Sequence, residues 1–262
     1  MFKEIIFPSG EVHTTLLINS LEERNDLECG HVLILENPSN NDLFGLAMKV
    51  ETLRRYSVEN LILDIPYFPG SRQDRVINDN ESFDLKVYAN FINSLQFNEV
   101  HITNPHSYVT PALINNVYVS NGFDFFIQGI NIIAESKGSN NNTIDIVIPD
   151  AGATKKVEDL VMEISKIYPN TIFNTIQCLK KRDPATGKLS GFRVLGNYDK
   201  FVPKVIIDDI CDGGGTFIGL AKEFEGCEDL SLLVTHGFFS KGKEELQKHF
   251  VTVKSQYDYS KQ

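Results

Sequence analysis

Short hydrophobic runs alternate with amphipathic segments along most of this 262-residue chain. The runs have the length of strands, and the segments between them repeat apolar residues every three or four positions, as helices do. In the stretch 41–56, for example, Leu43, Leu46, Val50 and Leu53 share one side of a helix. The pattern predicts strands at 31–36, 60–67, 99–103, 144–150, 175–181, 204–209 and 230–236. It predicts helices at 41–56, 82–95, 155–168 and 217–224.

Strand–helix alternation indicates parallel sheets joined by right-handed crossovers. The stretch 137–143, "KGSNNNT", is the most polar and least periodic part of the chain, and the alternation starts again after it. We therefore expect an α/β protein of two halves, each with a mainly parallel sheet flanked by helices.

Composition narrows the function classes. The net charge of −10 argues against nucleic acid as the main partner, because no basic face is evident. The four cysteines, Cys29, Cys178, Cys211 and Cys227, lack the CxxC spacing of zinc sites and fit reduced thiols. The N-terminus has no long apolar core, and no apolar stretch approaches the roughly 20 residues of a membrane span. A cytoplasmic protein without membrane attachment is expected.

The stretch "VIIDDICDGGGTFIGLA" (205–221) carries the strongest chemical signal. A buried strand, Val205–Ile207, is followed by Asp208 and Asp209, and then by a glycine loop that leads to a helix. Glycines let backbone N–H groups approach a ligand, and such loops bind phosphate, while the acids can hold sugar hydroxyls or a magnesium ion. The alternative is a plain glycine-rich turn capped by Asp212.

Polar residues also follow three other predicted strands, where ligands of parallel sheets bind. "SRQDR" (71–75) brings two arginines that match phosphate oxygens. His106 and Asp150 end the next two strands. Each has an ordinary explanation as well: a solvated charged loop, a loop histidine without a ligand, and a turn-capping aspartate.

Taken together, these segments resemble the ribose-phosphate pyrophosphokinases, the phosphoribosyl pyrophosphate (PRPP) synthetases. "IPYFPGSRQDR", "NPHS", "IVIPDAGATKK", "KKRDP", "VLGN" and "VIIDDICDGGGT" follow in the order and at the spacing of that family. "FPSGE" (7–11) and "PSNND" (38–42) are similar to its N-terminal motifs. The resemblance covers nearly the whole chain; the 208–216 loop is shared more widely, with phosphoribosyltransferases.

The resemblance implies two phosphoribosyltransferase-type domains. The first, 1–138, would bind ATP and form the oligomer. The second, 139–262, would bind the ribose phosphate, and its last residues can pack back on the first domain. The implied active unit is a homo-oligomer, a dimer or a hexamer, whose ATP site is shared between subunits.

The resemblance also implies a role for each candidate residue. The ATP-binding residues would be Arg72, Gln73, Arg75 and His106, with Phe7 and Glu11 from a neighbouring subunit. The catalytic residues would be Lys181 and Arg182, on a flexible loop, and His106. The ribose-phosphate site would comprise Asp208, Asp209, Asp212, Gly213, Gly214, Gly215 and Thr216. Mg²⁺ would be held by His106 and Asp150. The implied reaction moves the β,γ-diphosphoryl group of ATP to the anomeric hydroxyl of ribose 5-phosphate and releases AMP.

Three departures from the family pattern bear on this reading. Asp183 stands where an arginine is usual in the catalytic loop, with Arg182, Lys188 and Arg193 as candidate substitutes. Ser9 stands where an aspartate is usual. The loop "DGGGT" replaces "DTAGT" and leaves more space, which would admit a larger acceptor such as ADP-ribose and a role in NAD salvage. A non-catalytic, synthetase-associated regulatory homologue is the third hypothesis, which the intact set of site residues disfavours.

Overall fold

The computed structural model describes residues 2–17, 30–35, 40–136, 143–182 and 189–260. It divides into two compact units, 1–121 and 122–262. The boundary lies between Asn121 and Gly122, before the polar stretch expected to separate the domains at 138–139. Most of that stretch, together with Asp183 and Lys188, lies outside the described residues.

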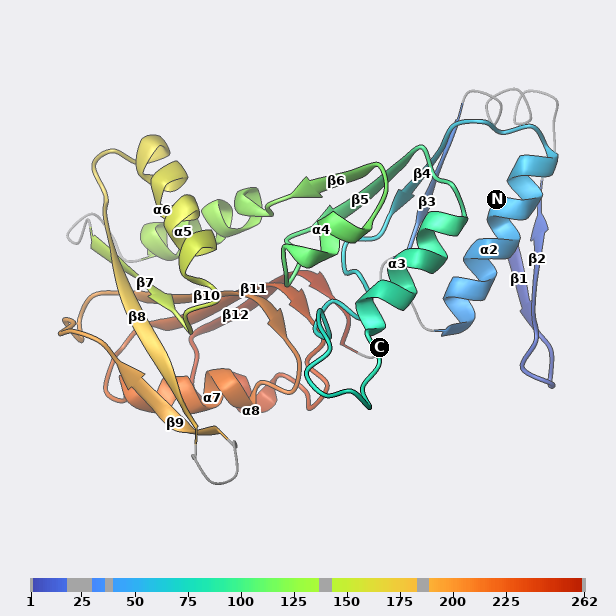
Figure 1. Ribbon diagram of the computed structural model, residues 1–262. Helices are drawn as coiled ribbons and strands as arrows, with labels where there is room; N and C mark the ends of the chain where they lie inside the picture. The colour runs from blue at the N-terminus through green and yellow to red at the C-terminus, as the bar shows by residue number, and fades with distance from the viewer. Residues whose placement is uncertain (1, 18–29, 36–39, 137–142, 183–188, 261–262) are drawn as a thin grey trace. The chain divides into compact units, whose positions relative to one another are not determined.

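Unit 1 is built on a four-stranded parallel sheet with the strand order β3-β4-β5-β6. Its strands are β3 (His31–Ile34), β4 (Leu61–Asp64), β5 (Glu99–Thr103) and β6 (Val117–Ser120). Between them run α2 (Asn40–Arg55), α3 (Asp84–Ser94) and α4 (Val109–Leu113) (Figure 1). The inward apolar residues of α2 and α3, such as Leu53 and Ile92, form one core with Leu61 and Leu63 of the sheet.

A separate antiparallel hairpin, β1 (Phe2–Ile6) and β2 (Val12–Leu16), precedes this sheet. It pairs Phe2 with Leu16 and Ile6 with Val12. The hairpin lies against α2, where Gly45 brings the helix backbone near Glu4 and Val12, and Lys49 of α2 forms an ion pair with Glu4. The turn 7–11 is therefore held at the tip of an ordered element.

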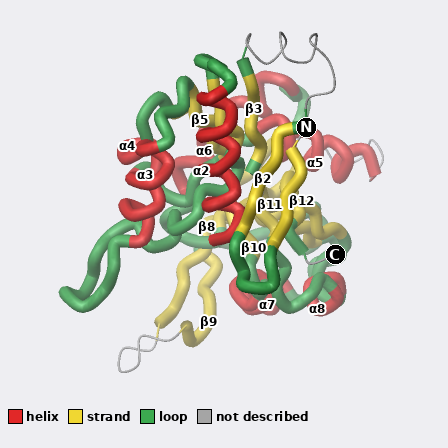
Figure 2. The backbone as a smooth tube through the Cα atoms, turned by 90° about the vertical axis from the view of Figure 1, so that its right-hand side faces the viewer, coloured by secondary structure: helices red, strands yellow, loops and turns green. Residues whose placement is uncertain are grey.

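Unit 2 contains a six-stranded sheet with the order β12-β11-β10-β7-β8-β9. Its strands are β7 (Thr143–Ile148), β8 (Ile172–Arg182), β9 (Leu189–Val194), β10 (Lys204–Cys211), β11 (Leu230–Gly237) and β12 (Thr252–Asp258). All neighbours are parallel except β8 and β9. The first part of β8 pairs with β7, and its last part, from Cys178, pairs with β9 as a two-stranded ribbon (Figures 1 and 2).

Helices cover both faces of this sheet. On one face, α5 (Phe123–Ser136) and α6 (Thr154–Ile167) pack on the sheet around Ile146 and Val205. On the other, α7 (Gly215–Ala221), the 3-10 turn η1 (Lys222–Phe224) and α8 (Glu244–Gln247) pack around Ile206 and Leu232. Burial on both faces explains the consecutive apolar residues 205–207 in β10 and 232–234 in β11.

The predicted strands and helices are confirmed in place, with ends shifted by a few residues. The predicted helix 217–224 starts earlier, at Gly215, and ends in the 3-10 turn η1. Periodicity did not predict β1, β2, α4, β6, α5, β9 or β12. Helix α5 belongs to unit 2 because Gly129 lets it approach β11: a Cβ at this position would lie 2.7 Å from Leu233 Cδ1. Among the described helices, none is both long and apolar enough to cross a membrane.

Candidate functional site

The loop after β4 carries the predicted ATP-binding residues and is shaped by Gly70. This glycine has φ +73°, and a Cβ there would lie 2.7 Å from Tyr88 Cδ2, so a larger residue would not fit. The Gln73 N–H donates to the Gly70 carbonyl at 2.9 Å, which closes a turn. Arg72 and Arg75 are exposed beyond this turn, as side chains that receive an anion must be.

Asp74 connects this loop to the loop that follows β5. Its side chain is only 11% exposed, and it accepts two hydrogen bonds from Arg75, from Nε at 2.6 Å and from a terminal nitrogen at 2.9 Å. The Ser107 side chain donates a further hydrogen bond to the Asp74 carboxylate. His106 lies close enough for its charge to affect the pKa of Asp74. The structure therefore brings the "RQDR" and "NPHS" segments together around one carboxylate.

The charge of Asp74 is strongly stabilised by these neighbours. The hydrogen bond from Arg75 lowers the pKa of the Asp74 carboxyl to about 2, helped by Ser107 and by the charges of Arg75 and His106, against an opposing effect of burial. In return, Asp74 raises the pKa of the Arg75 guanidinium. Asp74 is thus an anion at neutral pH that fixes the direction of Arg75.

The backbone near His106 is also joined to the first loop. The Thr103 N–H donates to the Pro66 carbonyl at 3.0 Å, and Asn104, a buried residue with φ +42°, donates its N–H to Ser120 at 2.7 Å. An asparagine tolerates this left-handed conformation better than most residues. The chain turns there, and His106 lies exposed at the surface.

The turn of the β1–β2 hairpin holds Phe7 and Glu11. Two backbone hydrogen bonds of 2.8 Å, Phe7 N to Glu11 O and Gly10 N to Phe7 O, close the turn, and Gly10 has φ +87°. Ser9 Oγ donates to Glu11 at 2.8 Å. Phe7 remains 46% exposed, which leaves its ring available for a contact outside this chain.

In unit 2, the predicted ribose-phosphate residues follow one another at the end of β10 and the start of α7. Gly214 has φ +74°, and a Cβ there would lie 3.2 Å from Leu246. Gly213 lies beside the aliphatic chain of Lys241, and a Cβ at Gly215 would meet nothing within 4 Å. Asp212 accepts a 2.7 Å hydrogen bond from Ser240 Oγ, which secures the beginning of the loop.

The two acids before this loop differ in their surroundings. Burial raises the pKa of the Asp208 carboxyl well above its usual range, and the negative charges of Asp209 and Asp150 add to the effect. Asp209 is buried, and one of its oxygens lies 3.8 Å from Lys156 Nζ. Asp208 therefore holds a proton more readily than an ordinary carboxyl, and a protonated carboxyl can donate to a ligand hydroxyl.

Asp150, a predicted magnesium ligand, has a different partner. Its Oδ2 forms an ion pair with Lys180 of β8, and its Oδ1 accepts the Gly152 N–H at 2.9 Å. Within the described ranges, no group of three or more His, Cys, Asp or Glu side chains is arranged to hold a metal ion. A cation at Asp150 would therefore compete with Lys180 for Oδ2, and the metal-ligand role of Asp150 remains a prediction.

Lys181 and Arg182, the predicted catalytic pair, end β8. Their backbones pair with Gly191 and Leu189 of β9, with an irregularity between them. Their side chains lie outside what the structure describes, so their roles remain predictions.

Cys211 ends the strand that carries Asp208 and Asp209. Burial raises the pKa of its thiol to about 12, and the charges of Asp208 and Asp212 contribute. The thiolate is the nucleophilic form of cysteine, so a thiol with this pKa is unreactive at neutral pH. Cys211 therefore serves packing, not nucleophilic catalysis.

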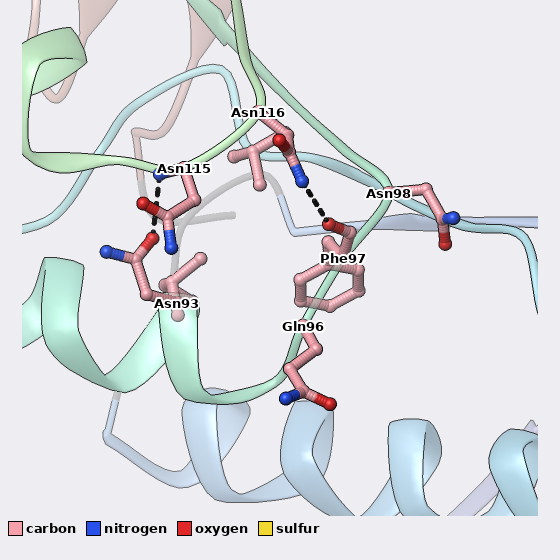
Figure 3. A pocket seen from close by; sticks show the side chains of 8 residues that line it. Asn93, Gln96, Phe97, Asn98, Asn115 and Asn116 are labelled. Carbon is pink, nitrogen blue, oxygen red and sulfur yellow. Dashed lines mark hydrogen bonds between the residues drawn. The ribbon is translucent and has the colours of Figure 1, made fainter.

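A pocket of about 410 Å³ lies elsewhere in unit 1, where α3 ends and β5 begins (Figure 3). Several amide side chains line it, but they secure neighbouring turns: Asn93 donates to Leu113 O at 2.9 Å, and Asn116 donates to Phe97 O at 3.1 Å. None of the predicted site residues lines this pocket.

Sequence reasoning missed several polar residues around the predicted site, namely Asp74, Ser107, Lys156, Lys180, Ser240 and Lys241. Four of them lie inside quoted motifs, Asp74 in "SRQDR", Ser107 in "NPHS", Lys156 in "IVIPDAGATKK" and Lys180 in "KKRDP", so the motifs indicated their neighbourhood. Ser240 and Lys241 follow β11 and come near the 212–216 loop because β10 and β11 are neighbours. That strand adjacency is a property of the fold.

Comparisons with known proteins agree with the predicted family. Residues 13–95 match the family model for the N-terminal domain of ribose phosphate pyrophosphokinase. The ribose-phosphate pyrophosphokinase of Mycoplasmopsis pulmonis is 26% identical over 90% of this chain and 69% of its own length. That of Bacillus subtilis is 25% identical over 89% of this chain and 69% of its own length. For the Ureaplasma parvum and Mycoplasma genitalium enzymes, the match spans 63% and 59% of their length.

The fold has a counterpart among solved structures. The crystal structure of phosphoribosylpyrophosphate synthetase from Mycobacterium smegmatis superposes with a TM-score of 0.73, covering 95% of this chain and 77% of that one, at 17% identity. This likeness confirms the predicted α/β fold. The sequence relatives, the matched N-terminal model and the order of the motifs all point to similarity with the ribose-phosphate pyrophosphokinases.

Proposed function

We propose that this protein is a diphosphokinase that converts ATP and ribose 5-phosphate into PRPP and AMP. The anomeric hydroxyl oxygen of the sugar would attack the β-phosphorus of ATP. The bond between that phosphorus and the α,β-bridging oxygen would break, AMP would leave with this oxygen, and the hydroxyl proton would pass to solvent. Phosphoryl transfer of this kind depends mainly on positioning and on neutralising phosphate charge.

One observation carries the proposal: the Asp74 carboxylate joins Arg75 of "RQDR" to Ser107 and His106 of "NPHS". Two exposed basic residues from different loops are thus gathered around one fixed anion within unit 1. An arginine held in a defined direction binds phosphate oxygens with less loss of side-chain entropy. In this proposal Arg72, Gln73 and Arg75 bind ATP, His106 contacts its phosphates and Mg²⁺, and Phe7 and Glu11 complete the adenine site of a second subunit.

The loop of unit 2 would bind the acceptor. Backbone N–H groups of 212–216 would surround the 5-phosphate, and Thr216 would add its hydroxyl. Asp208 and Asp209 would bind the ribose hydroxyls, with Asp208 as donor when it carries a proton. Lys181 and Arg182 would neutralise the transferred phosphates, and Mg²⁺, entering with ATP, would bridge phosphate oxygens and offset their charge.

ADP-ribose is the second candidate acceptor, with NAD salvage as the corresponding role. The space at the loop favours it, because a Cβ at Gly215 would meet nothing within 4 Å and one at Gly213 would meet only the flexible Lys241. The product would then be ADP-ribose pyrophosphate by the same chemistry.

The test is AMP release from ATP and Mg²⁺ with ribose 5-phosphate, with ADP-ribose, and without an acceptor. We expect acceptor-dependent AMP release that Arg75→Ala reduces at least about tenfold, the effect of losing one charge-assisted contact. Arg55→Ala is the matched control, because Arg55 is an exposed arginine paired with Glu51 on α2. Absence of AMP release with both acceptors would instead support the regulatory homologue.

A further inference from the structure

Lys180 of β8 and Asp150, just after β7, lie at the end of the sheet in unit 2 that holds the acceptor loop. β7 and β8 are parallel and pair up to Ile148 and Gln177, and both residues follow shortly after these positions. The Lys180 Nζ forms an ion pair with Asp150 Oδ2. The two side chains are 28% and 29% exposed, so the pair is partly shielded from water.

The ion pair lies beside the two acids of β10. β10 is parallel to β7 and pairs with it directly, so Asp208 and Asp209 end up near Asp150. Negative charges this close repel one another, and both the raised pKa of Asp208 and nearby cations reduce this repulsion. Two ammonium groups supply positive charge here, Lys180 at Asp150 and Lys156 at 3.8 Å from Asp209.

A divalent cation at Asp150 would need oxygen ligands that are free to turn toward it. Each Asp150 oxygen already has one partner, Lys180 at Oδ2 and the Gly152 N–H at Oδ1, so a cation at Oδ2 would have to displace Lys180. The described residues also offer no three-ligand group of metal-binding side chains at this place. An ammonium group is a compact point charge that can neutralise a carboxylate without any metal.

We propose that Lys180 is a positioning residue that holds Asp150 in the place where a divalent cation would otherwise bind, so that the acceptor site works without a protein-bound metal. This inference rests on the proposed function, in which Asp208 and Asp209 bind the acceptor, with Asp150 close to Asp208. Mg²⁺ then enters the reaction only as the complex with ATP. Lys180 orients Asp150 and offsets the charge of the three acids.

Direct binding of Mn²⁺ to the full-length protein, measured by electron paramagnetic resonance without nucleotide, tests this. Lys180→Met removes the ammonium group but keeps an unbranched side chain, and it should bind Mn²⁺ at least about tenfold more tightly than the wild type, because a neighbouring positive charge is gone. Adding Asp150→Asn to Lys180→Met should abolish the gain. Lys166→Met is the matched control, since Lys166 forms an exposed pair with Glu163 on α6, and it should leave the affinity unchanged.

Two further variants keep the test decisive if Lys180→Met does not fold. Lys180→Arg retains the charge and should bind Mn²⁺ as weakly as the wild type. Asp150→Asn alone should leave the Mn²⁺ affinity of the wild type unchanged, because Asp150 is not a metal ligand there. Equal Mn²⁺ affinity in wild type and folded Lys180→Met overturns the inference, as does a tight wild-type Mn²⁺ site that Asp150→Asn removes.

These outcomes are separate from those of the proposed function. Mn²⁺ affinity is measured without substrates and does not depend on turnover. A wild type that releases AMP but whose Mn²⁺ affinity is unaffected by Lys180→Met would retain the diphosphokinase assignment and lose the role of Lys180. If the wild type is inactive but Lys180→Met binds Mn²⁺ more tightly, the role of Lys180 is retained and the diphosphokinase assignment is lost.

Discussion

Asp74, in the loop after β4, accepts a hydrogen bond from Ser107, in the loop after β5. These residues are far apart in the sequence and meet because β4 and β5 are parallel neighbours. Carboxyl ends of adjacent parallel strands lie at the same edge of a sheet, where ligands of such folds bind. Asp74 also holds Arg75, so one carboxylate sets the positions of two segments with predicted roles in ATP binding.

Replacing Asp74 with Asn should weaken ATP binding more than it slows the chemical step. The amide cannot pair with Arg75 as a charged acceptor, so Arg75 loses its fixed direction. We expect the KM for ATP to rise about tenfold, with a smaller change in kcat, the size of one charge-assisted hydrogen bond. Initial rates of AMP release at varied ATP measure both. Asp79→Asn, an exposed acid in the same loop, should behave as the wild type; an unchanged KM for Asp74→Asn would contradict the positioning role.

The same carboxylate should make stability depend on acidic pH. The folded pKa of Asp74 is lowered to about 2, so its contribution to the free energy of unfolding is fully present above the unfolded value near pH 4. The contribution falls as the pH drops toward 2. Because Arg75 is exposed and solvent screens the pair, we expect about 1 kcal/mol. Urea unfolding of wild type and Asp74→Asn at several pH values measures it: the difference should shrink between pH 5 and about pH 2, and a difference that grows there would exclude this account.

Lys181→Ala should reduce turnover at least about a hundredfold, the scale of losing one transition-state donor. Lys181 ends β8 at the start of the loop that resembles the catalytic loop of the family. ATP binding, followed by equilibrium titration, should change little because the lysine acts on the phosphates as they transfer. Turnover within a few-fold of the wild type would mean that another residue supplies the charge.

If Phe7 and Glu11 belong to a neighbouring subunit's adenine site, two inactive variants should complement each other. A mixture of Glu11→Lys and Asp209→Asn proteins should recover part of the activity after subunit exchange, since some hybrid sites contain both intact residues. Mass spectrometry of differently labelled subunits confirms the exchange. If exchange is complete and the mixture stays inactive, the sites are built within one chain.

The glycine loop can be probed at two positions with different expectations. Gly214→Ala should lower Tm by about 3 °C or more, because φ is +74° and Leu246 is close. Gly213 does not have a positive φ, and a Cβ there would lie 3.4 Å from the flexible Lys241 chain, so Gly213→Thr should fold normally. The added threonine should lower the use of ADP-ribose relative to ribose 5-phosphate by about tenfold through steric exclusion. Equal losses of activity with both acceptors would show that Gly213 is needed for the backbone conformation of the loop and does not determine the choice of acceptor.

Hydrophobic periodicity and motif order were enough to predict the similarity to ribose-phosphate pyrophosphokinases, the α/β fold and the strand ends that carry the candidate site. These features are local, since a buried strand and an amphipathic helix each leave a pattern in consecutive residues. Several other elements were missed. The strand β9 and the helix α5 are examples, and α5 belongs to unit 2 because Gly129 fits closely against Leu233.

Only the tertiary structure decided which side chains meet. Asp74 contacts Ser107 because β4 and β5 pair, and Asp150 is held by Lys180 because β7 and β8 pair in one particular register. The motif "KKRDP" alone could not show which lysine reaches Asp150, since a shift of one residue along a strand turns a side chain to the opposite face. Likewise, three consecutive glycines read alike in the sequence, and the backbone shows that only Gly214 requires a positive φ. Strand register and backbone conformation follow from packing between distant segments, which a linear pattern does not encode.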